Sequence, residues 1–96
     1  MRLRFSRDAQ KDLVEIVRYI ARDNPLRATS FADELVLACQ ELGDHPERFP
    51  SLKRYAARGL RRRPYGNYSI IYAVGSDVVF IVRIISSARD LDALVD

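Results

Sequence analysis

The chain of 96 residues contains one cysteine, one histidine, one methionine and no tryptophan. The single cysteine, Cys39, excludes an internal disulfide, and the single histidine, His45, excludes a metal site built on a histidine pair. The longest apolar runs, residues 69–74 and 78–82, have the length of strands and are too short to span a bilayer. The basic N-terminus is not followed by an apolar run of the signal-peptide type. We therefore expect a cytoplasmic protein without a membrane span.

Common catalytic motifs are also missing. The sequence has no Gly-rich phosphate loop, paired-cysteine motif, His-Glu metal helix or serine nucleophile motif. We therefore expect no metal and no cofactor. Cys39 stands among apolar residues at helical spacing and is interpreted as a small core residue, whereas His45 precedes Pro46 in a loop and is interpreted as a capping or surface residue.

Length and composition indicate one ordinary folded domain. A chain this short closes one modest core and cannot divide it, so residues 1–96 form a single domain. Hydrophobic residues make up 48% of the chain and charged residues 30%, which is typical of globular proteins and not of disordered ones.

Acidic residues are missing between Glu47 and Asp77. Residues 1–50 carry 8 basic and 9 acidic side chains (net −1), whereas residues 51–96 carry 8 and 4 (net +4). A patch of this kind attracts an acidic partner, but sheets also protect an edge strand with charge, and the charge pattern leaves both readings open. The basic residues of the acid-free stretch are Arg48, Lys53, Arg54, Arg58, Arg61, Arg62 and Arg63.

The N-terminal half has the pattern of a strand followed by two helices. Residues 1–5 alternate as a strand does, and Ser6 is placed to cap a helix that ends near Asp23. Asn24 and Pro25 then begin a second helix, which Gly43 is expected to end. The short connection predicts an antiparallel helical hairpin. Its apolar stripes are Ala9, Leu13, Ile16, Val17 and Ile20 in the first helix, and Ala28, Phe31, Ala32, Leu35, Ala38, Cys39 and Leu42 in the second.

The C-terminal half has the pattern of three consecutive strands after a loop over residues 44–57. Strands are predicted over residues 58–64, 68–74 and 77–86, and residues 86–96 are expected to form a turn into a short helix or an ordered tail. The fold class is therefore α+β, with the N-terminal strand and the helical hairpin packed on a mainly antiparallel sheet.

Gly75 and Ser76 suggest a two-residue turn, which fixes a strand register. In that register Val74 lies opposite Asp77 and Tyr68 lies opposite Arg83. The face that carries Ile71 and Phe80 is the more apolar one and is expected to lie under the helices. Arg83 within an apolar strand then marks either an open face or a paired ion, of which the open face is favoured.

Arginine and tyrosine side chains remain as candidates for chemistry. Aromatic and guanidinium groups that converge on one sheet face stack on bases and hold phosphates, so RNA binding is one hypothesis. The alternative is that the tyrosines fill the sheet face and the arginines only solubilise it. The residues concerned are Arg61, Arg63, Tyr65, Tyr68 and Arg83.

The order of elements and several stretches resemble the ParE/RelE superfamily of bacterial toxin–antitoxin systems. The stretches are LRRRPYGNYSIIYAV (60–74), VVFIVRIISSARD (78–90), LDAL (91–94) and the helical hairpin from residue 6 to residue 35. Together they cover nearly the whole chain. The resemblance implies a toxin, either a RelE-type ribosome-dependent mRNA endonuclease or a ParE-type inhibitor of DNA gyrase that needs no active site of its own.

The side chains present suit gyrase inhibition better than RNA cleavage. RNA cleavage by 2′-hydroxyl attack needs groups that take and deliver protons, and an arginine stays protonated. Arg61 and Arg83 can therefore supply only positive charge, which leaves Tyr65 and Tyr68 as the proton-transfer candidates of an RNase. Ser86 stands where many relatives carry histidine, and this departure leaves open an inactive or retargeted toxin. We expect a gyrase-directed toxin first, an mRNA endonuclease second, and a toxin-fold binding module with an altered or lost target third.

The resemblance also implies partners. A cognate antitoxin with an acidic, partly disordered segment is expected to bind the toxin in a hetero-oligomer, and operator DNA is expected to be bound only indirectly, through the antitoxin. The predicted antitoxin-binding residues are Leu13, Val17, Ile20, Phe31, Leu35, Arg58 and Arg62. The predicted target-binding residues are Arg61, Arg63, Tyr65, Tyr68, Arg83, Ser86 and Arg89.

Overall fold

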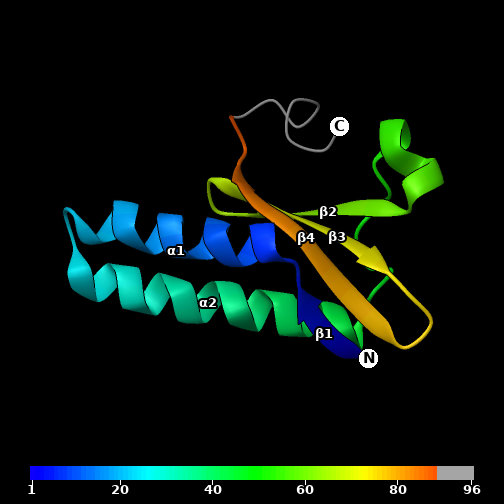
Figure 1. Ribbon diagram of the computed structural model, residues 1–96, viewed down its shortest axis with the longest axis horizontal. Helices are drawn as coiled ribbons and strands as arrows, with labels where there is room; N and C mark the ends of the chain where they lie inside the picture. The colour runs from blue at the N-terminus through cyan, green and yellow to red at the C-terminus, as the bar shows by residue number, and fades with distance from the viewer. Residues whose placement is uncertain (89–96) are drawn as a thin grey trace.

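Seven elements follow one another in residues 1–88, the part of the chain that the computed structural model describes (Figure 1). They confirm the expected α+β order of a strand, a helical hairpin and three further strands. The helix or tail expected over residues 86–96 falls mostly outside the described residues. The elements are β1 (Arg2–Phe5), α1 (Arg7–Ala21), α2 (Pro25–Asp44), the 3₁₀-helix η1 (Lys53–Arg58), β2 (Leu60–Tyr65), β3 (Tyr68–Val74) and β4 (Val78–Ser86).

Both helices begin where the sequence predicts. The hydroxyl oxygen of Ser6 accepts a hydrogen bond from the Ala9 N–H at 2.9 Å and so caps α1. The side-chain oxygen of Asn24 accepts one from the Arg27 N–H at 3.0 Å, and Pro25 is the first residue of α2. Within residues 1–88 neither helix is long and apolar enough to cross a membrane.

Gly43 does not end α2, which continues to Asp44. It is buried instead against the start of the chain, where an added Cβ atom would lie 2.8 Å from the carbonyl oxygen of Met1. The prediction of a glycine stop was therefore wrong. The glycine is needed for close packing of α2 on this carbonyl.

The strands form one sheet in the order β1-β4-β3-β2 (Figure 1). β1 pairs with β4 in parallel, and the other two pairs are antiparallel. Parallel pairing is possible here because α1 and α2 carry the chain from β1 across the sheet before it returns. Both helices lie on the same face of the sheet, and η1 lies on the opposite face.

The register between β3 and β4 differs from the predicted one. Val74 lies opposite Val79, and the connecting loop is closed by a hydrogen bond of 2.7 Å from the Gly75 N–H to the Val78 carbonyl. Further along, the register shifts at a bulge, because Tyr72 lies opposite Ile81 whereas the preceding residue of β3 lies opposite Arg83. The predicted turn at Gly75 and Ser76 was therefore wrong by one residue, because Ser76 and Asp77 are the two residues enclosed by this bond.

The bulge and the loop also change which face the helices cover. The main core packs α1 and α2 on Ile70, Tyr72 and Ile81, whereas Ile71 belongs to a second, smaller core beneath η1. Phe80, which was expected under the helices, lies on the other face and is 44% exposed. The prediction failed because both faces are apolar, so the strand sequence alone does not distinguish the face covered by the helices.

Candidate target-binding face

Arg83 is held by a buried carboxylate of the first helix. Its Nε and Nη2 atoms donate hydrogen bonds of 2.8 and 2.9 Å to the two carboxylate oxygens of Asp12, which also accepts the Ile84 N–H at 2.9 Å. The hydrogen bonds to this carboxylate raise the pKa of Arg83 further above its ordinary value. The open face favoured for Arg83 was therefore wrong, and the alternative of a paired ion is confirmed. No sequence signal had selected Asp12, because it lies among charged residues of α1.

The three consecutive arginines of β2 are also engaged within the protein. Arg61 Nη1 donates to the carbonyl of Phe49 at 2.6 Å, and Arg62 Nε donates to the hydroxyl of Ser69 at 2.8 Å. Arg63 Nη1 donates to the carbonyl of Ala38 at 2.9 Å. All three side chains are half-buried, so each has only part of its donors available for a partner.

Arg63 is the most enclosed of the three. Its side chain is 12% exposed and its guanidinium carbon lies 5.2 Å from the ring centre of Phe49 and 5.9 Å from that of Tyr65. Its Nη2 atom is 3.4 Å from the carboxylate of Glu41, and its Nε is buried without a hydrogen-bond partner among the described residues. Arg63 therefore joins the sheet to α2 through charge, hydrogen bonding and contact with aromatic rings.

Tyr65 and Tyr68 meet at the ring of Phe31. The ring centres of Tyr65 and Tyr68 lie 5.9 and 5.7 Å from that of Phe31. The Tyr65 hydroxyl donates a hydrogen bond of 2.9 Å to the Glu34 carboxylate, which also pairs with Arg27. Because its proton is used in this bond, the pKa of Tyr65 is raised. This hydroxyl is thus poorly suited to take a proton from a substrate.

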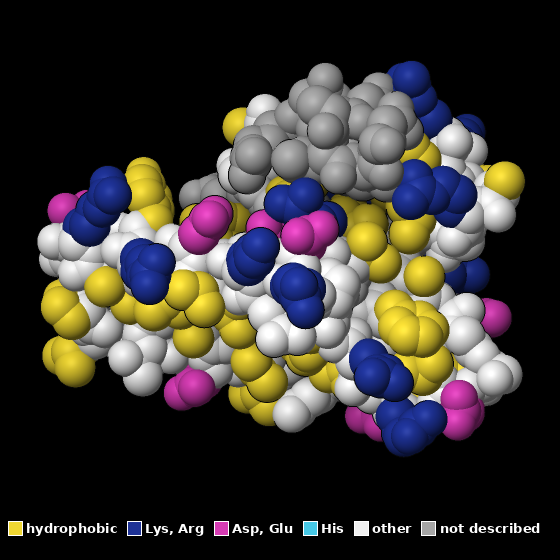
Figure 2. Space-filling model, viewed as in Figure 1, with side chains coloured by type: hydrophobic (Ala, Val, Ile, Leu, Met, Phe, Trp, Pro, Cys, Tyr) yellow, Lys and Arg dark blue, Asp and Glu magenta, His cyan; other side chains and the backbone are white. Residues whose placement is uncertain are grey.

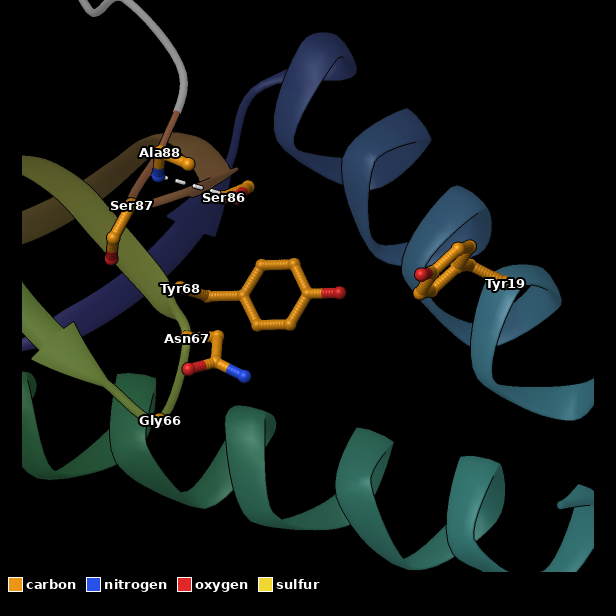
Figure 3. A pocket seen from close by; sticks show the side chains of 7 residues that line it. All are labelled: Tyr19, Gly66, Asn67, Tyr68, Ser86, Ser87 and Ala88. Carbon is orange, nitrogen blue, oxygen red and sulfur yellow. Dashed lines mark hydrogen bonds between the residues drawn. The ribbon is translucent and has the colours of Figure 1, made fainter. Parts of the chain in front are cut away.

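Tyr68 lies in a pocket with a volume of about 760 Å³. Figure 3 shows its ring pointing across the pocket toward Tyr19 of α1, with Asn67 beside it and Ser86 at the end of β4. Burial raises the pKa of Tyr68, so its hydroxyl stays protonated at neutral pH. The Ser86 hydroxyl accepts the Ala88 N–H at 3.3 Å. Of the residues predicted to bind a target, Tyr68 and Ser86 are brought together here.

The predicted antitoxin-binding residues divide by burial. Phe31 and Leu35 belong to the main core and have little or no surface to offer. Leu13, Val17 and Ile20 of α1 are half-buried. Arg58 is exposed on η1, whereas Arg62 is held by Ser69 as described above. Arg89, predicted to bind the target, lies outside the described residues.

The sequence did not single out the apolar side chains that are in fact exposed. Helical periodicity marks the core face of a helix but not the isolated apolar residues on its outer face. Phe80 additionally lines a groove of about 510 Å³ on the outer sheet face, together with Arg4 and Arg58. The large exposed apolar residues are Met1, Val14, Tyr19, Leu26, Leu37 and Phe80.

Residues 1–88 contain no group of side chains arranged as a metal site, and their one cysteine is not a reactive thiol. No group of three or more histidine, cysteine, aspartate or glutamate side chains there is arranged to hold a metal ion. Cys39 is fully buried in the main core, as predicted, and burial raises its pKa to about 12. Its thiol is therefore protonated at neutral pH and is not a nucleophile.

Solved structures of toxin–antitoxin systems contain chains with a similar fold. The chain has the fold of a chain in a structure described as the chromosomal ParDE toxin–antitoxin system from P. aeruginosa, with 21% identity, a TM-score of 0.68, and coverage of 90% of this chain and 95% of that one. It is equally similar to a chain of the toxin–antitoxin complex RelBE2 from Mycobacterium tuberculosis, with 24% identity, a TM-score of 0.68, and coverage of 88% and 95%. No curated protein matches the chain.

A match of the sequence to a family model identifies the protein family. Residues 3–91 match the family model described as the ParE toxin of the type II toxin–antitoxin system parDE; the match includes the whole helical hairpin and all four strands except Arg2 at the start of β1. The chain therefore belongs to the ParE family of toxins from type II toxin–antitoxin systems.

Proposed function

We propose that this ParE-family toxin acts in the cytoplasm by binding and inhibiting DNA gyrase, and that a cognate antitoxin neutralises it. The observation that carries the proposal is the pairing of Arg83 with Asp12, together with the bond from Arg61 to the Phe49 carbonyl. These were the two arginines considered for stabilising a phosphorane, and both are used to hold the fold. Neither is therefore a free cation for RNA cleavage, and neither is included in the target contact proposed below.

The proton-transfer candidates of an RNase are also engaged. Tyr65 donates its proton to Glu34, and the pKa of Tyr68 is raised by burial. RNA cleavage requires one group that accepts a proton near neutral pH, and neither tyrosine is suited to that step. These contacts favour gyrase over messenger RNA as the target.

The proposed target contact is the pocket formed by Tyr19, Tyr68 and Ser86. It brings two of the predicted target-binding residues, Tyr68 and Ser86, onto one surface between α1 and the end of β4. Tyr19 is 66% exposed, so the change Tyr19→Ala removes an aromatic side chain without opening the core.

Gyrase supercoiling of relaxed plasmid DNA, with the purified toxin added, tests the proposal. We expect the toxin to inhibit supercoiling and to cause cleaved DNA to accumulate, and we expect Tyr19→Ala to weaken both effects. Leu26→Ala, which also removes an exposed apolar side chain but from the start of α2, is the matched control and should act like the unmodified toxin. Absence of both effects would remove gyrase as the target. New mRNA ends in primer extension after toxin expression would assign the RNase activity instead.

An antitoxin partner is supported by the two structural neighbours, both of which come from toxin–antitoxin systems. We propose that the antitoxin contacts the half-buried residues of α1, of which Val17 is not part of the main core. Val17→Asp should then weaken the complex, measured by calorimetric titration, whereas Leu26→Asp should not. Expression of the toxin without the antitoxin is expected to arrest growth.

A further inference from the structure

The outer side of α1 carries a row of cations. Arg7, Lys11 and Arg18 lie along the helix at spacings of four and seven residues, and Arg22 follows four residues later at its C-cap. All four side chains are exposed. Because an α-helix rises about 1.5 Å per residue, the row is about 22 Å long. Figure 2 shows lysine and arginine side chains along α1 on one face of the molecule, continuing beside β1.

These four residues, here named the α1 cation row, are not used by the fold. Within residues 1–88 none of them forms an ion pair or a side-chain hydrogen bond, in contrast to the arginines of β2 and β4. The nearest acids on α1 are Asp8 and Glu15. Glu15 lines the same groove as Arg7, Lys11 and Arg18, but within residues 1–88 neither Glu15 nor Asp8 forms an ion pair with a cation of the row.

Helix stability accounts for only part of the row, because Arg18 and Arg22 stand at the C-terminal end of α1, where the helix dipole favours cations. Arg7 with Lys11, and Arg18 with Arg22, are like charges four residues apart, an arrangement that disfavours a helix. Arg7 also stands at the first position of α1, where the positive end of the helix dipole repels a cation. An anionic partner would offset the cost of the two like-charge pairs and of Arg7 at the N-terminal end of α1.

The row fits phosphates better than an acidic protein segment. An amphipathic acidic helix would have to bury apolar surface, and Val14 is the one exposed apolar side chain within the row. The row has no aromatic residue on which an unpaired base could stack, since Tyr19 lies toward the Tyr68 pocket. A straight row of cations on the exposed side of a helix instead matches the regularly spaced phosphates of duplex DNA.

We propose that the α1 cation row binds the phosphate backbone of duplex DNA directly and without sequence preference. Arg4, exposed on β1 at one end of the row, lies where a longer duplex would continue. The sequence had suggested contact with DNA only through the antitoxin. The proposal does not depend on gyrase, because DNA binding by the isolated toxin involves no other protein, and its failure would leave the gyrase proposal untouched.

Fluorescence anisotropy with a labelled duplex of about 25 base pairs tests the proposal at several salt concentrations. With four phosphates neutralised, the logarithm of the affinity should fall against the logarithm of salt with a slope of about −3.6, or roughly 100-fold between 50 and 200 mM salt. Lys11→Gln and Arg18→Gln should each reduce the slope by about 0.9 and weaken binding about tenfold at 50 mM salt.

Lys53→Gln is the matched control, since it removes one exposed lysine from η1, outside the row. It should leave the slope unchanged, and circular dichroism should show all variants folded. The proposal is overturned if the duplex does not bind at 50 mM salt, or if Lys53→Gln lowers the slope as much as Lys11→Gln does. Tighter binding of polyglutamate than of the duplex would assign the row to an acidic protein. Tighter binding of single strands, lost in Phe80→Ala, would place an unpaired strand in the groove beside the row.

Discussion

The Asp12 carboxylate and the Arg83 guanidinium, 71 residues apart, form a two-bond ion pair that fastens α1 to β4. Their side chains are 6% and 16% exposed, so water screens the pair weakly. The same carboxylate accepts the Ile84 N–H, next to the bulge in β4. One acid therefore holds both a strand side chain and a strand backbone group in place.

Removing this carboxylate should be costly. We expect Asp12→Ala to lower the free energy of unfolding by about 3–5 kcal/mol, because it leaves a half-buried arginine and a buried N–H without a partner. Urea denaturation measures the change. Asp77→Ala, which breaks the exposed pair with Arg2, is the control and should cost no more than about 1 kcal/mol. The double change Asp12→Leu with Arg83→Met should be less harmful than Asp12→Ala alone. Equal stability of Asp12→Ala and the unmodified protein would contradict this role.

Arg63 should behave as a structural residue rather than a surface contact. Arg63→Ala removes its hydrogen bond to Ala38 and its packing on Phe49, and we expect a loss of about 1–3 kcal/mol in the free energy of unfolding. Lys53→Ala on exposed η1 should change it by less than about 0.5 kcal/mol. A variant at Arg63 that keeps full stability but loses toxicity would instead assign this arginine to target binding.

The cluster around Glu34 predicts a pH dependence of stability. Its pKa is lowered from 4.5 first by the hydrogen bond from Arg27 and then by that from Tyr65. Because the folded-state pKa is the lower one, the carboxylate contributes stability that is fully present above pH 4.5 and is lost as pH falls through the folded-state pKa. Glu34→Gln should therefore be less stable than the unmodified protein at pH 7, and the difference should shrink below pH 4. Thermal melts across this range measure it, and a difference that does not vary with pH would contradict the assignment.

Cys39 should be unreactive in the folded protein. Alkylation requires the thiolate, and burial raises the pKa of this thiol to about 12. We expect no labelling by iodoacetamide at pH 8 in buffer and complete labelling in denaturant, as mass spectrometry would show. Because labelling requires unfolding, Asp12→Ala should accelerate it. Rapid labelling of the stable, unmodified protein would show that the core around α2 opens readily.

Local sequence determined the elements and several of their ends. Ser6, Asn24 and Pro25 satisfy the first N–H groups of the two helices through bonds within a few residues, so their roles are visible in the sequence. The apolar stripe of α2 predicted its buried face, including Cys39 and Leu42. The resemblance to ParE toxins, which the family match confirms, likewise depended on consecutive residues.

Tertiary structure decided the pairing of distant groups. The loop after Val74 and the bulge near Tyr72 set the strand register, and each depends on contacts that neither strand reveals alone. The partner of Arg83 comes from α1 and that of Arg63 from α2. Both arginines were predicted to contact a target, and only the assembled fold shows that they bind groups within the protein instead. The α1 cation row was not predicted from the sequence for the same reason. The first half of the chain is nearly neutral in total, and only the assembled fold shows that this side of α1 is exposed and that its cations are not paired within residues 1–88.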